Sequence, residues 1–287
     1  MKWGPFVLGD IADIQTLSDA IETYKPMAIF HFAADAIVLE STQNPAKYYR
    51  NNVVGTLCLL ETMTLHGIKQ LIFSSTCSIY GTDNLMPIQE NHALCPITPY
   101  GRSKWMAEQI MDDFDKAYDL KTIKLRYFNA AGADPEIEIG ENHTPETHLI
   151  PRAIQAALGL RDEIVVYGTD FETRDGSAIR DFTHVKDLAD AHVLAFNYLL
   201  NTQQSDVFNL GTGSGTSVLE IIDAVKEYCG ASFAVRLEKR QAGDPDILTA
   251  DIQKAQQILK WEPKYSSLTT IIETACKWHQ SISEVTV

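Results

Sequence analysis

The sequence predicts an α/β protein with a doubly wound parallel sheet and a smaller second lobe. Short β-branched or aromatic runs alternate with longer amphipathic stretches, which is typical of βα units around a parallel sheet. The runs at 28–33 and 71–73 are apolar on both faces, as buried parallel strands are. After about residue 130, Gly- and Pro-bearing loops separate shorter elements. We therefore expect one lobe at 1–130, joined by 184–210, and another at 131–287, with a cleft where they meet.

The individual elements follow from the same patterns in chain order. Expected strands lie at 6–9, 27–33, 70–76 and 122–129, and expected helices lie at 13–24, 45–66 and 99–118. Further along, three glycines in the run from Gly211 to Gly215 precede Ser217-Val-Leu-Glu220, which has the pattern of a helix capping box. We interpret these glycines as the turn that begins a helix, not as a phosphate-binding loop.

The composition limits the classes of function. An apolar share of 45% with 22% charged residues is ordinary globular usage, which excludes a disordered or fibrous chain. The 38 acidic residues against 24 Lys and Arg give a net charge of −14, so nucleic acid and anionic membranes are disfavoured as partners. Five cysteines without metal or CxxC spacing indicate free thiols. With no signal-peptide pattern and no apolar run of membrane-spanning length, we expect a cytoplasmic protein.

Tyr100 and Lys104 are the first candidates for chemistry. They stand four residues apart in the expected helix that Pro99 begins, so they share one face of it. A lysine ammonium near a phenol stabilises the phenolate, so we expect Lys104 to lower the pKa of Tyr100 from about 10 and to make it a base near neutral pH. Taken alone, this spacing is also typical of a solvated helix face.

Three consecutive hydroxyls strengthen the chemical interpretation. The expected strand at 70–76 ends in Ser74, Ser75 and Thr76. The carboxyl ends of strands in an open α/β sheet face the ligand, so these hydroxyls would be placed to hydrogen-bond a substrate hydroxyl or to pass on its proton. A polar strand end with local turn hydrogen bonds is the structural alternative. Together with the Tyr/Lys helix, the hydroxyls indicate proton removal from an alcohol whose carbon loses hydride.

Several motifs, in one order along the chain, make a resemblance specific. They are FHFAA, SST, YGRSK, LRYFNAAGA and RDFTHVKDLADAH. On these motifs the chain resembles the extended short-chain dehydrogenase/reductase family, and within it the UDP-glucose 4-epimerases, from Trp3 to about Trp278. The resemblance implies a Rossmann-like doubly wound sheet, a substrate-binding lobe, NAD as cofactor, a UDP-sugar as substrate, and a homodimer formed through the two long helices.

The resemblance also implies residue roles in a reaction of galactose metabolism. Tyr100 would take the proton of the sugar C4 hydroxyl as hydride passes to NAD, and hydride would return to the other face of the resulting 4-keto sugar. Lys104 would bind the nicotinamide ribose, and Thr76 would bridge the sugar O4 and Tyr100. The implied cofactor-binding residues are Asp10, Ile11, Phe32, Ala33, Ala34, Asn52, Ser74, Tyr100, Lys104 and Tyr127. The implied substrate-binding residues are Thr76, Asn129, His148, Leu149, Tyr167, Arg180, Arg240 and Asp244.

Two departures from the family pattern bear on binding. Gln241 stands where the family usually has a second arginine, which leaves open whether Arg240 compensates. The family's first βαβ unit, with its glycine-rich turn, is missing ahead of the segment that starts at Trp3, so we expect a sheet that is incomplete at its N-terminal side. Such a turn holds the cofactor pyrophosphate, so the chain as printed is expected to bind NAD poorly.

Three alternatives accompany this interpretation. A nucleotide-sugar dehydratase needs carboxylates after Thr76, where this chain has Cys77 and Ser78, so it is disfavoured. A non-catalytic or inactive sugar-nucleotide-binding remnant is the second alternative. A metal site is the third, because the stretch from Glu141 to His148 holds two glutamates and two histidines; their spacing fits no common site, and we expect no metal.

Overall fold

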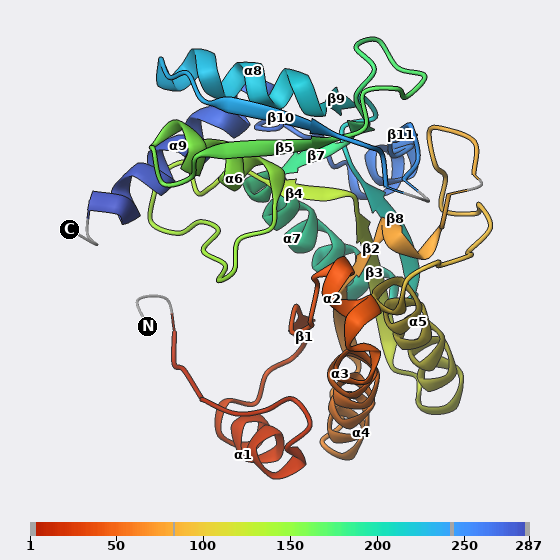
Figure 1. Ribbon diagram of the computed structural model, residues 1–287. Coiled ribbons are helices and arrows are strands. Elements are labelled where there is room, and N and C mark those ends of the chain that lie inside the picture. The colour runs from red at the N-terminus through yellow and green to blue at the C-terminus, as the bar shows by residue number, and fades with distance from the viewer. Residues whose placement is uncertain (1–3, 83, 242–243, 285–287) are drawn as a thin grey trace. The chain divides into compact units, whose positions relative to one another are not determined.

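The computed structural model describes residues 4–82, 84–241 and 244–284 in two compact units (Figure 1). Unit 1 contains the chain up to Gly81, Ala93–Arg126 and Ala195–Phe208. Unit 2 contains Thr82–His92, Tyr127–Leu194 and the chain from Asn209 onward. Within the described ranges, no helix is both long and apolar enough to cross a lipid bilayer.

Unit 1 is built on a four-stranded sheet, and the predicted parallel pairing is present in it. The strand order is β1-β2-β3-β8, and β1 runs parallel to β2 with Ile29 opposite Leu71 and His31 opposite Phe73. The strands are β1 (Ile29–His31), β2 (Gln70–Thr76), β3 (Lys121–Tyr127) and β8 (Asp206–Leu210). The expected strand at 70–76 therefore coincides with β2.

Two helices of unit 1 begin at side chains that cap them. Asp13 accepts hydrogen bonds from the backbone of Gln15 and Thr16 and begins α1 (Ile14–Tyr24). Thr98 accepts from the Gly101 backbone and begins α5 (Pro99–Tyr118), with Pro99 in the first turn. The other helical segments are α2 (Val38–Gln43), α3 (Pro45–Tyr48), the π-helix η1 (Tyr49–Gly55), α4 (Thr56–Leu65) and the 3₁₀ turn η2 (Cys77–Ile79). Helix α7 (Val185–Thr202) belongs to unit 2 up to Leu194 and to unit 1 from Ala195.

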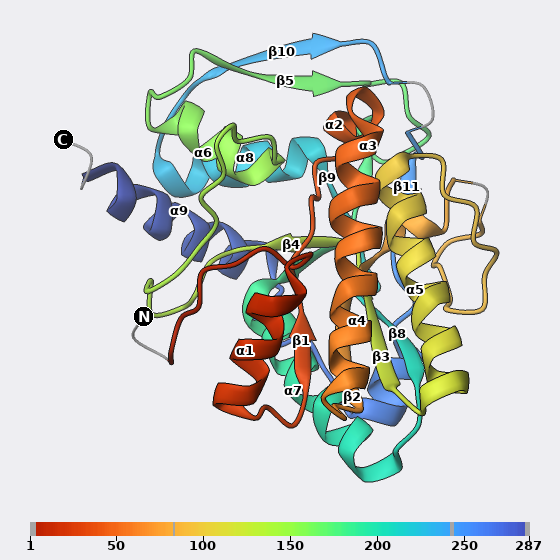
Figure 2. The same ribbon diagram turned by 90° about the horizontal axis from the view of Figure 1, so that it is seen from below.

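One apolar cluster ties these helices to the sheet. Figure 2 shows α4 and α5 side by side. Burial of these side chains against β2 stabilises the unit, at roughly 25 cal/mol for each Å² of apolar surface. The buried members are Ile21, Leu59, Leu60, Met63, Ile68, Leu71, Phe73, Ala107, Met111 and Leu120.

Unit 2 consists of helices and short paired strands, which are parallel except for the antiparallel pair of β6 and β9. Its helices α6, α8 and α9 contact one another, and β5 and β10 lie side by side (Figure 2). The pairs are β4 with β7 and β5 with β10, and β6 lies between β11 and β9. The strands are β4 (Asn129–Ala131), β5 (Glu163–Tyr167), β6 (Ile179–Arg180), β7 (Phe182–His184), β9 (Thr216–Ser217), β10 (Ala234–Glu238) and β11 (Ile247–Leu248). The helices are α6 (Leu149–Ala157), α8 (Val218–Cys229), the π-helix η3 (Ala255–Leu259) and α9 (Leu268–Glu284).

The glycine-rich run has the structural role predicted for it. Ser217 and Glu220 form a complete capping box at the start of α8. A Cβ on Gly211 would lie 2.5 Å from Oδ2 of Asp181, and the backbone of Thr212 donates to Oδ1 of that carboxylate at 2.7 Å. The glycine therefore lets the turn close around a buried aspartate.

Three expected strands differ from the structure. The strand expected at 6–9 is wrong: this segment is extended but unpaired among the described residues, and Leu8 is 85% exposed. An apolar run becomes a strand only where a neighbouring strand accepts its hydrogen bonds, which local pattern does not report. The strand expected at 27–33 is reduced to β1, and the one at 122–129 divides into β3 and β4.

The helix expected at 45–66 is interrupted by η1, whose wider turns carry Asn52. The Asn52 amide satisfies the Asp35 backbone, accepting from its N–H at 2.9 Å and donating to its carbonyl at 3.0 Å. No local sequence pattern predicts this pairing of Asn52 with Asp35. It occurs in the segment where the expected α-helix is a π-helix.

Candidate active site

Helix α5 carries the Tyr/Lys pair of unit 1. Lys104 is buried, and its Nζ donates to the Ser74 carbonyl at 2.8 Å and lies 4.8 Å from the centre of the Phe73 ring. Tyr100, one turn earlier, packs edge-on against Tyr48 at a centroid distance of 6.4 Å. Both side chains are therefore held against the end of β2.

Thr76 joins this pair at the carboxyl end of β2. Its hydroxyl oxygen accepts from the Ser78 backbone at 3.1 Å, which begins the turn η2, and it also forms a hydrogen bond with the Tyr100 side chain. The structure therefore brings together Thr76, Tyr100 and Lys104, which were predicted as one catalytic group. A Tyr phenol beside a Thr hydroxyl is suited to proton transfer with an alcohol.

The expected direction of the Tyr100 pKa is wrong. Burial raises the pKa of Tyr100 to about 12, and the hydrogen bond from Thr76 offsets only part of this rise. Burial also lowers the pKa of Lys104 to about 7. The physical reason is that helical spacing places the two residues on one face but does not direct the ammonium, which is bound to the Ser74 carbonyl.

The hydroxyl of Ser75 has a different role from that expected. It is buried and donates to Oε1 of Glu108 at 2.5 Å. Successive side chains of a strand point to opposite faces, so Ser75 faces away from its neighbours Ser74 and Thr76. Only alternate residues of the three-hydroxyl run are therefore available to a ligand.

Beside Lys104, a polar network holds Asn52 in place. Asn52 Nδ2 donates to Oγ of Ser103 at 3.0 Å, and the Asn52 carbonyl accepts from the Thr56 hydroxyl at 2.6 Å. His31 Nε2 lies 2.9 Å from that hydroxyl, which makes Nε2 the donor because the hydroxyl proton is already used. Sequence reasoning missed His31, Thr56 and Ser103. Polar residues spaced four apart in an otherwise apolar helix were the available signal.

Burial keeps His31 neutral, which gives a testable pH dependence. Burial, with the nearby Lys104 charge, lowers the pKa of His31 to about 3. Because the unfolded chain binds a proton near pH 6.5 and the folded one does not, the stability contribution of neutral His31 is lost as pH falls below 6.5. When the pH is lowered from 7.5 to 5, the free energy of unfolding of the parent should fall by about 2 kcal/mol more than that of His31→Gln. Urea unfolding at the two pH values measures this difference. Equal losses in both proteins would contradict this assignment.

The other predicted cofactor residues occupy loops of unit 1, with one exception. The Asp10 carboxylate accepts a hydrogen bond from the Ala12 backbone at 2.8 Å. The Ile11 side chain packs closely over Gly55, since a Cβ added to that glycine would lie only 2.6 Å from it. Tyr127 belongs to unit 2, where its ring lies 5.9 Å from that of His192. Phe32, Ala33 and Ala34 follow β1 directly and are exposed or half-buried.

In unit 2 the predicted residues Arg180, Arg240 and Asp244 gather around one loop. Arg180 donates from Nη1 to the Pro245 carbonyl at 2.9 Å, and its Nη2 lies 3.7 Å from the Asp244 carboxylate. Arg240 donates from Nη2 to the Asp244 carbonyl at 3.2 Å and to the Asp246 carboxylate at 3.0 Å. A hollow of about 530 Å³ is lined by Arg240, Asp244 and the segment around Asn84. The loop thus holds two guanidinium groups, each of which lies next to a carboxylate.

The remaining predicted substrate residues lie on separate elements of unit 2. Asn129, in β4, donates from Nδ2 to the Asp181 carbonyl at 3.0 Å. His148 and Leu149 stand at the start of α6. Tyr167 ends β5 and is 43% exposed. Gln241, at the position of the absent arginine, is exposed beside Arg240.

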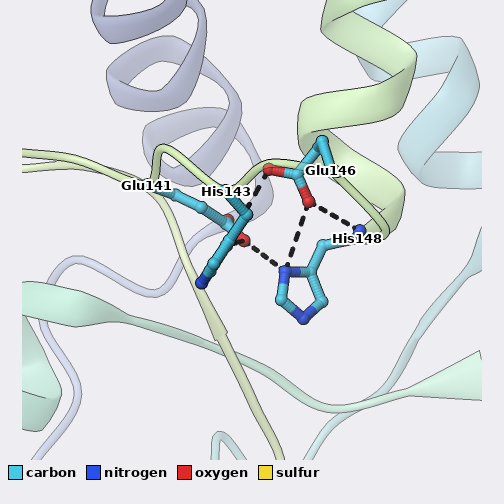
Figure 3. A group of neighbouring side chains, drawn as sticks. All are labelled: Glu141, His143, Glu146 and His148. Carbon is cyan, nitrogen blue, oxygen red and sulfur yellow. Dashed lines mark hydrogen bonds and ion pairs between the residues drawn. The ribbon is translucent and has the colours of Figure 1, made fainter. Parts of the chain in front are cut away.

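His148 belongs to the group of two glutamates and two histidines whose spacing along the chain fits no common metal site. The side chains of Glu141, His143, Glu146 and His148 meet in one place (Figure 3). His143 Nδ1 lies 3.0 Å from Oε1 of Glu141, and His148 Nδ1 contacts the same oxygen. Hydrogen bonds to Glu141 and Glu146 raise the pKa of His148 to about 10.

Comparisons with known proteins show which proteins this chain is similar to. A family model described as GDP-mannose 4,6 dehydratase matches residues 4–274. The UDP-glucose 4-epimerase of Rhizobium meliloti is 50% identical over 97% of this chain and 85% of its own length. The crystal structure of the Brucella ovis UDP-glucose 4-epimerase in complex with NAD has a TM-score of 0.94 and 50% identity, covering 96% of this chain and 85% of that one. A Stenotrophomonas maltophila UDP-glucose 4-epimerase, with bound NAD and formylated UDP-arabinopyranose, has a TM-score of 0.94 and 37% identity, covering 98% and 84%.

The parallel sheet, with its strand-end threonine and buried Tyr/Lys pair, defines the class as a Rossmann-like short-chain dehydrogenase/reductase. Within that class, the chain belongs to the UDP-glucose 4-epimerase family. The alternative of a non-catalytic remnant is not supported, because relatives matched over 97% of this chain are isomerases and Thr76, Tyr100 and Lys104 are in place.

Proposed function

We propose that this protein catalyses the NAD-dependent 4-epimerisation of a UDP-sugar, interconverting UDP-glucose and UDP-galactose through a 4-keto intermediate. The observation that carries the proposal is the hydrogen-bonded Thr76–Tyr100 pair beside the buried ammonium of Lys104. The named activity of relatives at 50% identity supports it. In this proposal Thr76, Tyr100 and Lys104 transfer the proton, and Arg180 and Arg240 bind the diphosphate.

The buried ammonium of Lys104 fits a dinucleotide cofactor. Its three N–H donors have one hydrogen-bond acceptor among the described residues, the Ser74 carbonyl. Two donors remain for hydroxyls of a ribose, which matches the role implied for this residue. NAD, when bound, supplies a hydride acceptor and donor for C4 of the sugar. Within unit 1, the cofactor-binding residues of this proposal are Asp10, Ile11, Phe32, Ala33, Ala34, Asn52, Ser74 and Lys104.

The proton of the sugar C4 hydroxyl would move through Thr76 and Tyr100. Thr76 orients the hydroxyl, and the Tyr100 phenolate accepts its proton as C4 becomes a ketone; the same proton returns when C4 is reduced. A Tyr100 pKa of about 12 in the ligand-free protein means that little phenolate is present near neutral pH. The proposal therefore expects turnover to rise with pH across the neutral range.

A coupled assay tests the proposal directly. With saturating NAD, UDP-galactose should be converted into UDP-glucose, and mass spectrometry should find product of unchanged mass. Loss of water from the substrate would instead indicate the dehydratase chemistry after which the matching family model is named; Cys77 and Ser78 provide no carboxylate for it. Isothermal titration with NAD is the accompanying measurement, and micromolar affinity would overturn the expectation of poor binding.

Arg180 gives a prediction about substrate affinity. Replacing Arg180 with Lys keeps the charge but removes the bidentate geometry suited to a phosphate. We expect KM for the UDP-sugar to rise by about ten- to a hundredfold with a smaller change in kcat, since diphosphate binding is shared by ground and transition states. Steady-state kinetics measure this, and Arg174→Lys, at an exposed ion pair with Glu220, is the control. An unchanged KM in Arg180→Lys would contradict the role.

We infer that the functional form is a homodimer formed through α4 and α5. These helices carry exposed apolar side chains, among them Leu65 and Met106, and they lie side by side in unit 1. Exposed apolar groups on adjoining helices are typical of a subunit interface. Analytical ultracentrifugation should find twice the chain mass of 32.0 kDa, and Met106→Glu should shift the mass toward one chain.

A further inference from the structure

The cluster formed by Glu141, His143, Glu146 and His148, here called the Glu–His cluster, lies within unit 2 on the loop before α6. Each residue offers one ligand atom, and these atoms all lie within 4.8 Å of one another. Figure 3 shows both histidines directing Nδ1 toward the two carboxylates, while the second ring nitrogen of His148 points away from them. Four donors thus converge on one point.

The spacing of the donors suits a small tetrahedral cation. Zinc bonds to nitrogen and oxygen of about 2.0–2.1 Å place tetrahedral ligands about 3.3 Å apart. The distances from His143 Nδ1 to the carboxylates of Glu141 and Glu146 are 3.0 and 4.0 Å, and that from His148 Nδ1 to Glu146 is 3.5 Å. These values lie on both sides of the tetrahedral edge. His148 Nδ1 contacts Oε1 of Glu141 more closely than this, so these two atoms have to separate when both bind one ion.

We propose that the Glu–His cluster is a site for one divalent transition-metal ion, Zn²⁺, bound by two imidazole Nδ1 atoms and two carboxylates. Two carboxylates and two neutral imidazoles carry a net charge of −2, which the ion balances. Imidazole ligands favour zinc over magnesium and calcium, which prefer sites made of oxygen alone. The sequence argument against a metal rested on spacing along the chain, whereas coordination depends on distances in space.

A third histidine supplies an independent observation. His279, on α9, is 5% exposed. The carboxylates of Glu141 and Glu146 interact with it electrostatically, so this imidazole lies near the same centre. A third histidine therefore lies close to the two carboxylates of the cluster.

The surrounding structure preorganises the donors. Glu146 is buried, and its Oε1 accepts from the backbone of Thr147 and His148 at 2.7 and 2.8 Å. The Glu141 carbonyl accepts from Nε1 of Trp278 at 2.8 Å, which fastens the loop to α9. Outer hydrogen bonds of this kind orient ligands and strengthen metal sites. The zinc site lies within unit 2 and shares His148 with the substrate-binding residues that the resemblance implies.

Zinc titration of the full chain tests the proposal. After treatment with EDTA and its removal, calorimetry with ZnCl₂ should give one equivalent bound with micromolar or tighter affinity. His143→Ala and Glu141→Gln should each weaken zinc binding at least about tenfold. Removing a residue that only hydrogen-bonds to a metal ligand already lowers affinity by about that factor, and removing a ligand itself should lower it more. His92→Ala, at a histidine outside the cluster, is the matched control and should bind as the parent does.

A spectroscopic measurement keeps the test independent of variant folding. Co²⁺ added to the unmodified protein should develop the strong visible absorption of tetrahedral coordination, and Zn²⁺ should displace it. The absence of a saturable one-to-one phase, a weak octahedral Co²⁺ spectrum, or equal losses of affinity in His143→Ala and His92→Ala would each overturn the site.

Discussion

Replacing Tyr100 with Phe should lower kcat for UDP-galactose by about 10² to 10⁴, which is the usual contribution of a positioned acid or base. Thr76 remains hydrogen-bonded to the Ser78 backbone, so the loss falls on proton transfer and not on the architecture of the strand end. KM should change little, because the phenol acts chiefly in the transition state. Stopped assays at several pH values should also find that the residual rate no longer rises with pH.

Tyr48→Phe is the matched control for this substitution. Tyr48 packs edge-on against Tyr100, and its hydroxyl donates to the Ile37 carbonyl at 2.6 Å. Its removal should cost about 1 kcal/mol of stability while kcat stays near that of the parent. If Tyr48→Phe and Tyr100→Phe lost activity equally, Tyr100 would be a packing residue and not the base.

Glu108→Leu should destabilise unit 1 by about 3–5 kcal/mol, because it removes the carboxylate that forms an ion pair with the buried guanidinium of Arg126. The two side chains are 4% and 5% exposed, with Nη2 of Arg126 2.5 Å from Oε2 of Glu108. Burial opposes the charge of Arg126, but the hydrogen bond and charge of Glu108 hold its pKa above the ordinary value. Urea or thermal unfolding measures the loss.

Two further variants distinguish the loss of the ion pair from the loss of side-chain packing. Glu108→Leu with Arg126→Leu should lose less than the sum of the single variants, since neither charge is then left alone. Asp113→Ala breaks the pair with Lys116, in which both side chains are more than 70% exposed, and should change stability by less than about 1 kcal/mol. Additive losses at 108 and 126 would contradict the coupling.

Glu108 also links stability to the candidate active site. It stands one turn after Lys104, whose pKa is lowered by burial and partly restored by the charge of Glu108. It also holds Ser75, the neighbour of both Ser74 and Thr76. The buried ion pair is therefore part of the scaffold that positions the strand end, although it is not a catalytic group.

Much of the local structure could be predicted from the sequence. The helix beginning at Pro99 and the strand at 70–76 have the bounds expected of them, because caps and apolar runs act over a few residues. The capping box of Ser217 and Glu220 was predictable for the same reason. The motif resemblance also identified the family before any coordinates, since Thr76, Tyr100 and Lys104 lie in it together.

Charge and contact between distant residues could not be predicted in this way. The pKa of Tyr100 depends on its burial, and the expected opposite shift came from treating helical spacing as if it directed the Lys104 ammonium. The segment at 6–9 has the composition of a strand but no partner among the described residues, so its pattern alone misled.

Sequence alone determined the class of chemistry, because the Tyr, Lys and Thr occur in one motif order with strong local signals for the elements that carry them. Tertiary structure alone decided that the Ser75 hydroxyl is bound to Glu108, how the buried groups titrate, and that Glu141, His143, Glu146 and His148 converge. The physical reason is range: caps and periodicity act between near neighbours in the chain, whereas desolvation and convergence of ligands arise from the three-dimensional surroundings of each side chain.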